Sequence, residues 1–66
     1  MYLFGNLDHA TLREQEAIYL RRGCDAEALA RGESDPVLRK THNDRADICA
    51  GMLAHIRRTI ARRSRA

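Results

Sequence analysis

The chain has 66 residues, 32% of them charged and 5% aromatic, and a formal net charge of +3 at pH 7. A chain this short forms one domain at most, and it buries only about 60% of the surface that its unfolded form exposes. These values exclude a multidomain protein. They also predict a core that needs a supplement, for which we expect a second copy of the chain.

Charge is sorted along the chain. Residues 1–36 carry seven acidic and four basic side chains, whereas residues 37–66 carry two acidic and eight basic ones. The basic excess is concentrated near the end, in Arg57, Arg58, Arg62, Arg63 and Arg65. Such a cluster favours an acidic partner or a polyanion, and it specifies no activity.

Residues 1–7 form an apolar segment ahead of the first predicted helix. It contains two of the three aromatic residues, and the turn-forming pair at positions 5 and 6 interrupts it. We interpret it as an N-terminal arm and residues 8–66 as a single helical domain. The arm either packs on its own core or contacts a partner. In the second case the contact residues are Tyr2, Leu3 and Phe4.

Two helices are predicted before the midpoint of the chain. The first runs over about 8–22, because Thr11 and Glu14 stand at the spacing of a capping box and good helix formers follow them. The second covers about 25–31, with Asp25 as its N-cap. Gly23 separates the two as a typical helix end, although one helix that is kinked at Gly23 also fits the sequence.

The last predicted helix covers about 36–63. Asp35 can cap it, and Pro36 suits its first position because the missing N–H is not needed there. An unbroken helix of this length spans about 40 Å. Residues 41–44 favour caps and turns over helix interiors, so the sequence leaves open a break within this helix.

The last helix carries a broad apolar face with helical spacing. Its members are Ile48, Met52, Leu53, Ile56 and Ile60. We expect this face to pack against the earlier helices and against a second copy. The predicted fold is therefore all-α, a small helical hairpin of two to three helices that pairs into a homodimeric helical bundle.

The sequence contains no pattern typical of a catalytic, metal or cofactor site. Cys24, His42, Cys49 and His55 are residue types that bind zinc, but their separations along the chain match none of the usual zinc-ligand pairings. The glycines are scattered and form no phosphate-binding loop. We therefore expect no enzyme, no metal and no cofactor.

The two cysteines also bear on the compartment. The sequence has no secretory signal and no apolar stretch of membrane-spanning length. We expect two reduced thiols in a cytoplasmic protein that makes no membrane contact. A bridge between two helices is the alternative.

The basic residues of the last helix allow three interpretations. They complement the negative end of the helix dipole, they bind an acidic protein, or they neutralise phosphates of a nucleic acid. The residues concerned are Arg57, Arg58, Arg62, Arg63 and Arg65, with Arg39 and Lys40 assisting.

We expect a small non-enzymatic regulatory protein that acts by protein–protein interaction. An adaptor, an inhibitor or an anti-activator of the size often encoded by phages and mobile elements fits the absence of catalytic groups and the segregated charge. Its partners would be a second copy of the chain and a target protein. The alternative is a regulator that binds nucleic acid through its arginine-rich C-terminal helix.

Overall fold

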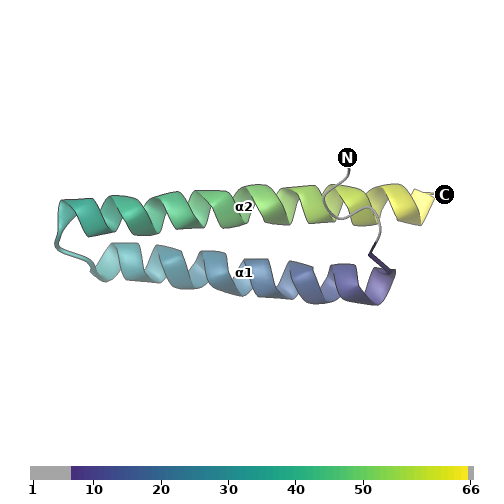
Figure 1. Cartoon of the computed structure of the whole chain (residues 1–66), viewed down its shortest axis with the longest axis horizontal. Coiled ribbons are helices and arrows are strands. Elements are labelled where there is room, and N and C mark those ends of the chain that lie inside the picture. The colour runs from purple at the N-terminus through teal and green to yellow at the C-terminus, as the bar shows by residue number, and fades with distance from the viewer. Residues whose placement is uncertain (1–6, 66) are drawn as a thin grey trace.

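Two long helices lie side by side and run in opposite directions (Figure 1). The computed structural model describes residues 7–65, in which α1 spans His9–Gly32 and α2 spans Pro36–Arg65. Residues 33–35 connect them, and the described parts contain no strand. The molecule measures 47 × 20 × 16 Å. The predicted all-α hairpin is therefore confirmed, with two helices.

Aspartate side chains start both helices. Asp8 Oδ1 accepts a hydrogen bond from the Thr11 N–H at 2.7 Å, and this bond lowers the pKa of Asp8. Asp35 Oδ1 accepts from the Val37 N–H at 2.8 Å, and Pro36 occupies the first position of α2. Each carboxylate satisfies an N–H group that has no partner inside its helix. The start of α2 is as predicted.

The predicted separation of residues 8–31 into two helices at Gly23 is not found. Helix α1 continues through Gly23 and Asp25, and no described glycine has a positive φ. Gly23 instead lies where α1 approaches α2, because a Cβ built on it would stand 3.4 Å from the Cβ of Cys49. This glycine serves close packing of the helices rather than a turn.

Helix α2 is also unbroken through its weakest segment. The Thr41 hydroxyl donates to the Val37 carbonyl at 3.1 Å, and Lys40 pairs with Asp44 at 2.8 Å. These side chains bond to groups of the same helix and so do not draw the backbone into a turn. The break that the sequence left open at residues 41–44 is absent.

Large apolar side chains meet only near the open end of the hairpin, within the described residues. Leu12 and Ile56 are fully buried, and Ile60 packs with them. Leu7, Tyr19 and Met52 cover this cluster from the side. Towards the connection between the helices, the buried positions are small. They are Ala26, Ala30 and Ala46.

The predicted apolar face of α2 is therefore divided. Ile56 and Ile60 are buried and Met52 and Leu53 are half-buried, but Ile48 is 66% exposed. Steps of four residues turn about 40° beyond a full helical turn, so Ile48 lies about 120° away from Ile60. The residues that face α1 follow alternating steps of three and four instead. They are 46, 49, 53, 56 and 60.

We expect Ile56→Ala to destabilise the hairpin by about 2–5 kcal/mol, because the substitution leaves a cavity beside Leu12. Urea unfolding followed by circular dichroism, at one fixed protein concentration, measures the change. Val37→Ala is the control, because Val37 is 73% exposed and its truncation should change the free energy of unfolding by about 0.5 kcal/mol or less. Equal losses in the two variants would contradict the assigned core.

Two glycine substitutions test the close approach of the helices. Gly51→Ala should stabilise the protein by about 0.5–1 kcal/mol, because alanine favours helix and no atom lies within 4 Å of the added Cβ. Gly23→Leu should instead destabilise it by about 1–3 kcal/mol, since the side chain must displace α2. Thermal unfolding distinguishes the two, and a stabilising Gly23→Leu would contradict this packing.

Candidate interaction surfaces

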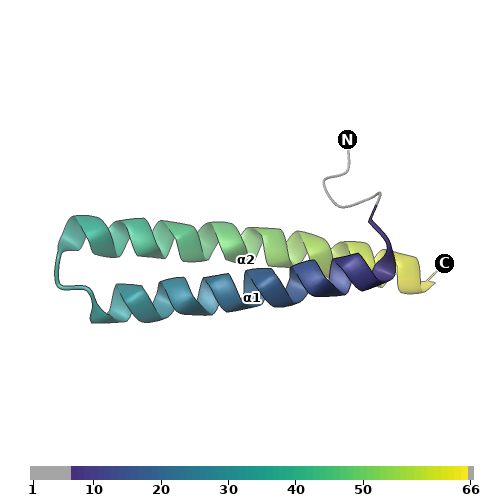
Figure 2. The same ribbon diagram turned by 60° about the horizontal axis from the view of Figure 1, so that its bottom comes forward.

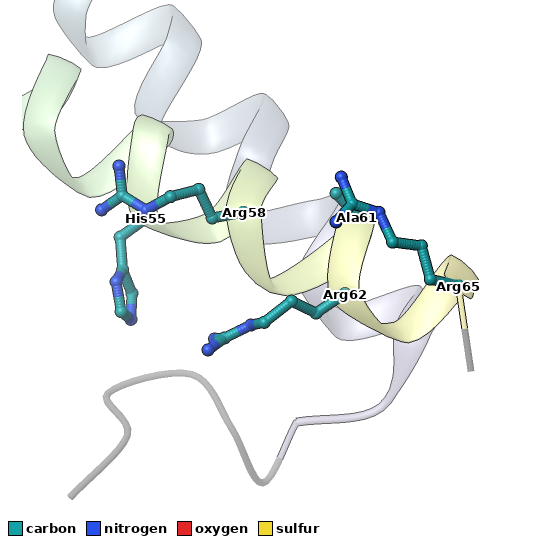
Figure 3. A pocket seen from close by; sticks show the side chains of 5 residues that line it. All are labelled: His55, Arg58, Ala61, Arg62 and Arg65. Atoms are coloured by element: carbon teal, nitrogen blue, oxygen red, sulfur yellow. The ribbon is translucent and has the colours of Figure 1, made fainter.

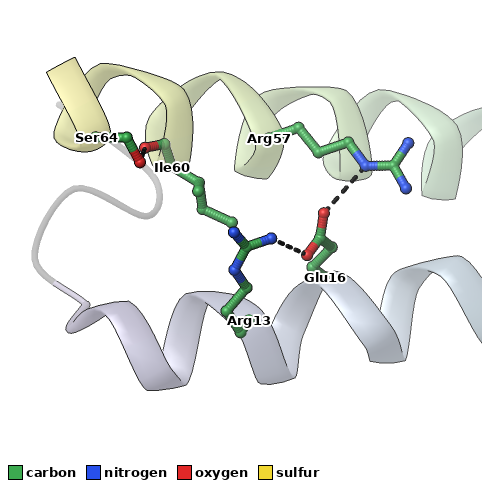
Figure 4. Close-up of polar contacts among 5 residues, drawn as sticks. All are labelled: Arg13, Glu16, Arg57, Ile60 and Ser64. Atoms are coloured by element: carbon green, nitrogen blue, oxygen red, sulfur yellow. Dashed lines mark hydrogen bonds and ion pairs between the residues drawn. The ribbon is translucent and has the colours of Figure 1, made fainter.

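The structure divides the C-terminal arginines into two groups. Arg57 points towards α1, where its Nε donates to Glu16 Oε2 at 3.1 Å, and Arg13 pairs with the same carboxylate at 3.0 Å (Figure 4). Arg63 donates to the backbone carbonyl of Leu7. Arg57 therefore joins the two helices, and Arg63 joins the two described ends of the chain.

The two assisting residues near the start of α2 also make contacts within the hairpin. Arg39 donates to the carbonyl oxygens of Glu33 at 3.1 Å and Ser34 at 3.5 Å, and it thereby ties α2 to the connection. Lys40 pairs with Asp44, and this pair raises the pKa of Lys40. Neither residue joins the C-terminal arginines, which lie about five turns further along α2.

The remaining arginines form one surface at the C-terminal end of α2. Arg58, Arg62 and Arg65 stand at i, i+4 and i+7, on the side of α2 that faces away from α1. With His55 and Ala61 they line a shallow hollow of about 340 Å³ (Figure 3). Arg62 also donates to the Thr59 hydroxyl at 3.4 Å. We call Arg58, Arg62 and Arg65 the arginine surface.

Two acidic side chains lie on the same side of α2 as the arginine surface, but closer to the connection. Asp44 precedes Arg62, and Asp47 precedes Arg65, by about five full helical turns, so each pair shares one face. The basic stretch from Arg58 to Arg65 is about 10 Å long. Within the described chain, neither Arg58 nor Arg65 forms an ion pair.

A second surface contains Ile48 and Met52, which the sequence analysis assigned to a packing face, together with three residues that it did not assign there. Five large apolar side chains lie on one face of the hairpin, outside the contact line between the helices. Their exposed fractions are 40% for Ile18, 55% for Leu29, 47% for Leu38 and 66% for Ile48, and Met52 is half-buried. We call these five residues the apolar surface. Their spacing could have revealed them, because each helix places them on a stripe of three- and four-residue steps.

The remaining sequence-based expectations concern chemistry and location. Among residues 7–65, no three of the metal-binding side-chain types gather into one site, and both cysteines are free thiols. Neither described helix holds an apolar stretch long enough to cross a bilayer. The proposed contact residues Tyr2, Leu3 and Phe4 lie outside the described residues, so their role stays a prediction.

Comparisons with known proteins give no match. No family model matches this chain, and neither a curated protein nor a solved structure matches it.

The arrangement around Glu16 predicts a pH dependence. Its hydrogen bonds, first that from Arg13 and then that from Arg57, hold the pKa of Glu16 below its ordinary value of 4.5. The folded state therefore binds the Glu16 proton more weakly than the unfolded state does. The resulting stabilisation is complete above the ordinary pKa and is lost as the pH falls through the lower, folded-state pKa.

We expect Glu16→Gln to reduce the loss of stability between about pH 6 and about pH 3. The difference from wild type should not exceed about 1 kcal/mol, as for other ion pairs at a protein surface. Urea unfolding across this range measures it. Glu14→Gln is the control, because Glu14 is exposed and makes no ion pair with another described residue. An unchanged pH profile for Glu16→Gln would contradict the proposed linkage.

Proposed function

We propose that this chain is a small non-enzymatic regulatory protein that acts by protein–protein contact. The observation that carries the proposal is the arginine surface, which has one sign of charge and faces away from the partner helix. Arginine binds carboxylates in a bidentate manner, and buried arginines dominate many interfaces. The target accordingly presents an acidic surface to Arg58, Arg62 and Arg65.

The small extent of the arginine surface supports a protein target over a nucleic acid. Affinity for a duplex grows with the number of phosphates neutralised, and strongly salt-dependent binders make about 6–10 such contacts. One copy supplies three arginines over about 10 Å, and the two copies of the proposed homodimer together supply six, the lower end of that range. A phosphate backbone that continued along α2 would meet Asp47 on the same face, whereas Asp44 there is paired with Lys40. A compact acidic patch meets no such repulsion.

Other parts of the proposal concern the working form of the protein. We propose that it acts as a homodimer in the cytoplasm, as an adaptor, inhibitor or anti-activator, with the N-terminal arm as an additional contact. Free thiols at Cys24 and Cys49 are compatible with a reducing compartment. The apolar surface supports self-association, because large exposed apolar patches mark interaction sites.

The test is affinity capture from a lysate of the source organism, with and without nuclease. We expect one dominant protein that survives nuclease treatment. Combining Arg58→Ala with Arg65→Ala should weaken its recapture by at least about tenfold, because interfacial arginines often contribute more than the roughly 1.4 kcal/mol that this factor represents.

Arg21→Ala with Arg31→Ala is the matched control, because it removes the same charge from exposed positions of α1. Equal losses in both double variants would indicate a general charge effect and contradict the proposed site. Recovery of nucleic acid, together with loss of the captured proteins after nuclease treatment, would overturn the proposal in favour of a nucleic-acid-binding regulator.

A further inference from the structure

The apolar surface is built from two stripes, one on each helix. On α1 the stripe runs through positions 18, 22, 25 and 29, and on α2 through positions 38, 41, 45, 48 and 52. Both stripes border the same depression, which is lined by Arg22, Asp25, Ala26, Leu29, Arg45 and Cys49. The stripes therefore lie on one face of the hairpin, and Leu20 borders a separate hollow with Cys24 and Glu27.

This face has the shape of an incomplete core. The depression holds about 250 Å³, and small side chains such as Ala26 and Cys49 form part of its lining. Ile48 lies one helical turn after Arg45 on the rim and is 66% exposed. Helices pack closely when a protruding side chain of one inserts into a hollow on the other, and this face offers both a protruding side chain and a hollow.

Two of the three charged side chains that line the depression, Asp25 and Arg45, can pair with a second copy of the same chain, and the third, Arg22, lies over the ring of Tyr19. Asp25 on α1 and Arg45 on α2 lie at the same level of the hairpin, because both line the depression beside Cys49. A two-fold axis along the hairpin places α1 of one copy over α2 of the other. Asp25 then faces Arg45 of the second copy, and the symmetry repeats this pair. The arginine surface, with one sign of charge, cannot match itself in this way.

We propose that the apolar surface is the interface of a two-fold homodimer, in which two hairpins form a four-helix bundle with their connections at the same end. This inference deepens the proposed function, since it identifies the interface of the homodimer included there. It leaves the arginine surfaces of both copies outside the interface. Ile48 of each copy enters the depression of the other, and Ile18 lies near Met52 of the second copy.

The first test is sedimentation equilibrium of the purified chain. We expect a dimer at micromolar concentrations, and we expect Ile48→Arg to be a helical monomer because its charge then enters a depression already lined by Arg22 and Arg45. Leu20→Arg is the matched control, an exposed leucine outside the proposed interface, and it should remain a dimer. A wild-type monomer at these concentrations would overturn the proposal and leave the face to a different protein.

A charge exchange tests the pairing itself. Asp25→Arg places two arginines opposite each other at each contact, and Arg45→Asp places two aspartates there. Each variant alone should dimerise about 100-fold more weakly than wild type, since like charges at an interface cost several kcal/mol. Mixing the two variants should restore a dimer, because every contact is then between opposite charges.

The mixing experiment separates association from folding, because a variant that merely failed to fold would not recover in the mixture. If the mixture stays monomeric while both variants are helical, the assigned interface is wrong. The outcome is independent of the target protein, because it is measured on the purified chain. Capture of a target that depends on Arg58 and Arg65 can therefore succeed or fail separately.

Discussion

The structure depends on close contact along one line between two antiparallel helices. Near the connection this contact is possible because the facing positions are small, as at Gly23, Ala26 and Ala46. Small residues bring backbones together but remove little apolar surface from water. The burial that stabilises the hairpin therefore comes from the other end, where Leu12, Ile56 and Ile60 meet. Figure 2 shows the two helices side by side near the connection, with the start of α1 passing in front of α2 towards the open end.

The small residues near the connection leave other large side chains without a place in the core. Because the contact line is filled by small residues near the connection, Leu29 and Ile48 find no place between the helices and stay on the surface. The same geometry turns Arg57 towards Glu16 and leaves Arg58 on the outside. One line of contact thus divides both the apolar residues and the arginines into those that face the other helix and those that lie away from it.

The fold class, the start of α2 and the burial of Ile56 and Ile60 could be predicted from the sequence. Asp35 and Pro36 act locally, so their roles could be predicted without knowledge of packing. The sequence left the continuity of α1 through Gly23 open, and the approach of Gly23 to Cys49 on the other helix is seen only in the structure. Ile48 does not pack between the two helices, since a row of four-residue steps drifts around the helix, and its predicted contact with a second copy stays a prediction. The split of the arginines likewise needed the position of Glu16 on α1.

The separation of the core from the connection also bears on how the chain folds. The positions nearest in sequence, on either side of the connection, contribute mostly small side chains, whereas Leu12 and Ile60 lie towards opposite ends of the chain. The loop-closure entropy must therefore be overcome before the contacts that reward it can form. During synthesis α1 emerges long before Ile56 and Ile60. Until those residues follow, α1 has no large apolar partner within the hairpin, and this interval is when it is most open to contacts with other chains.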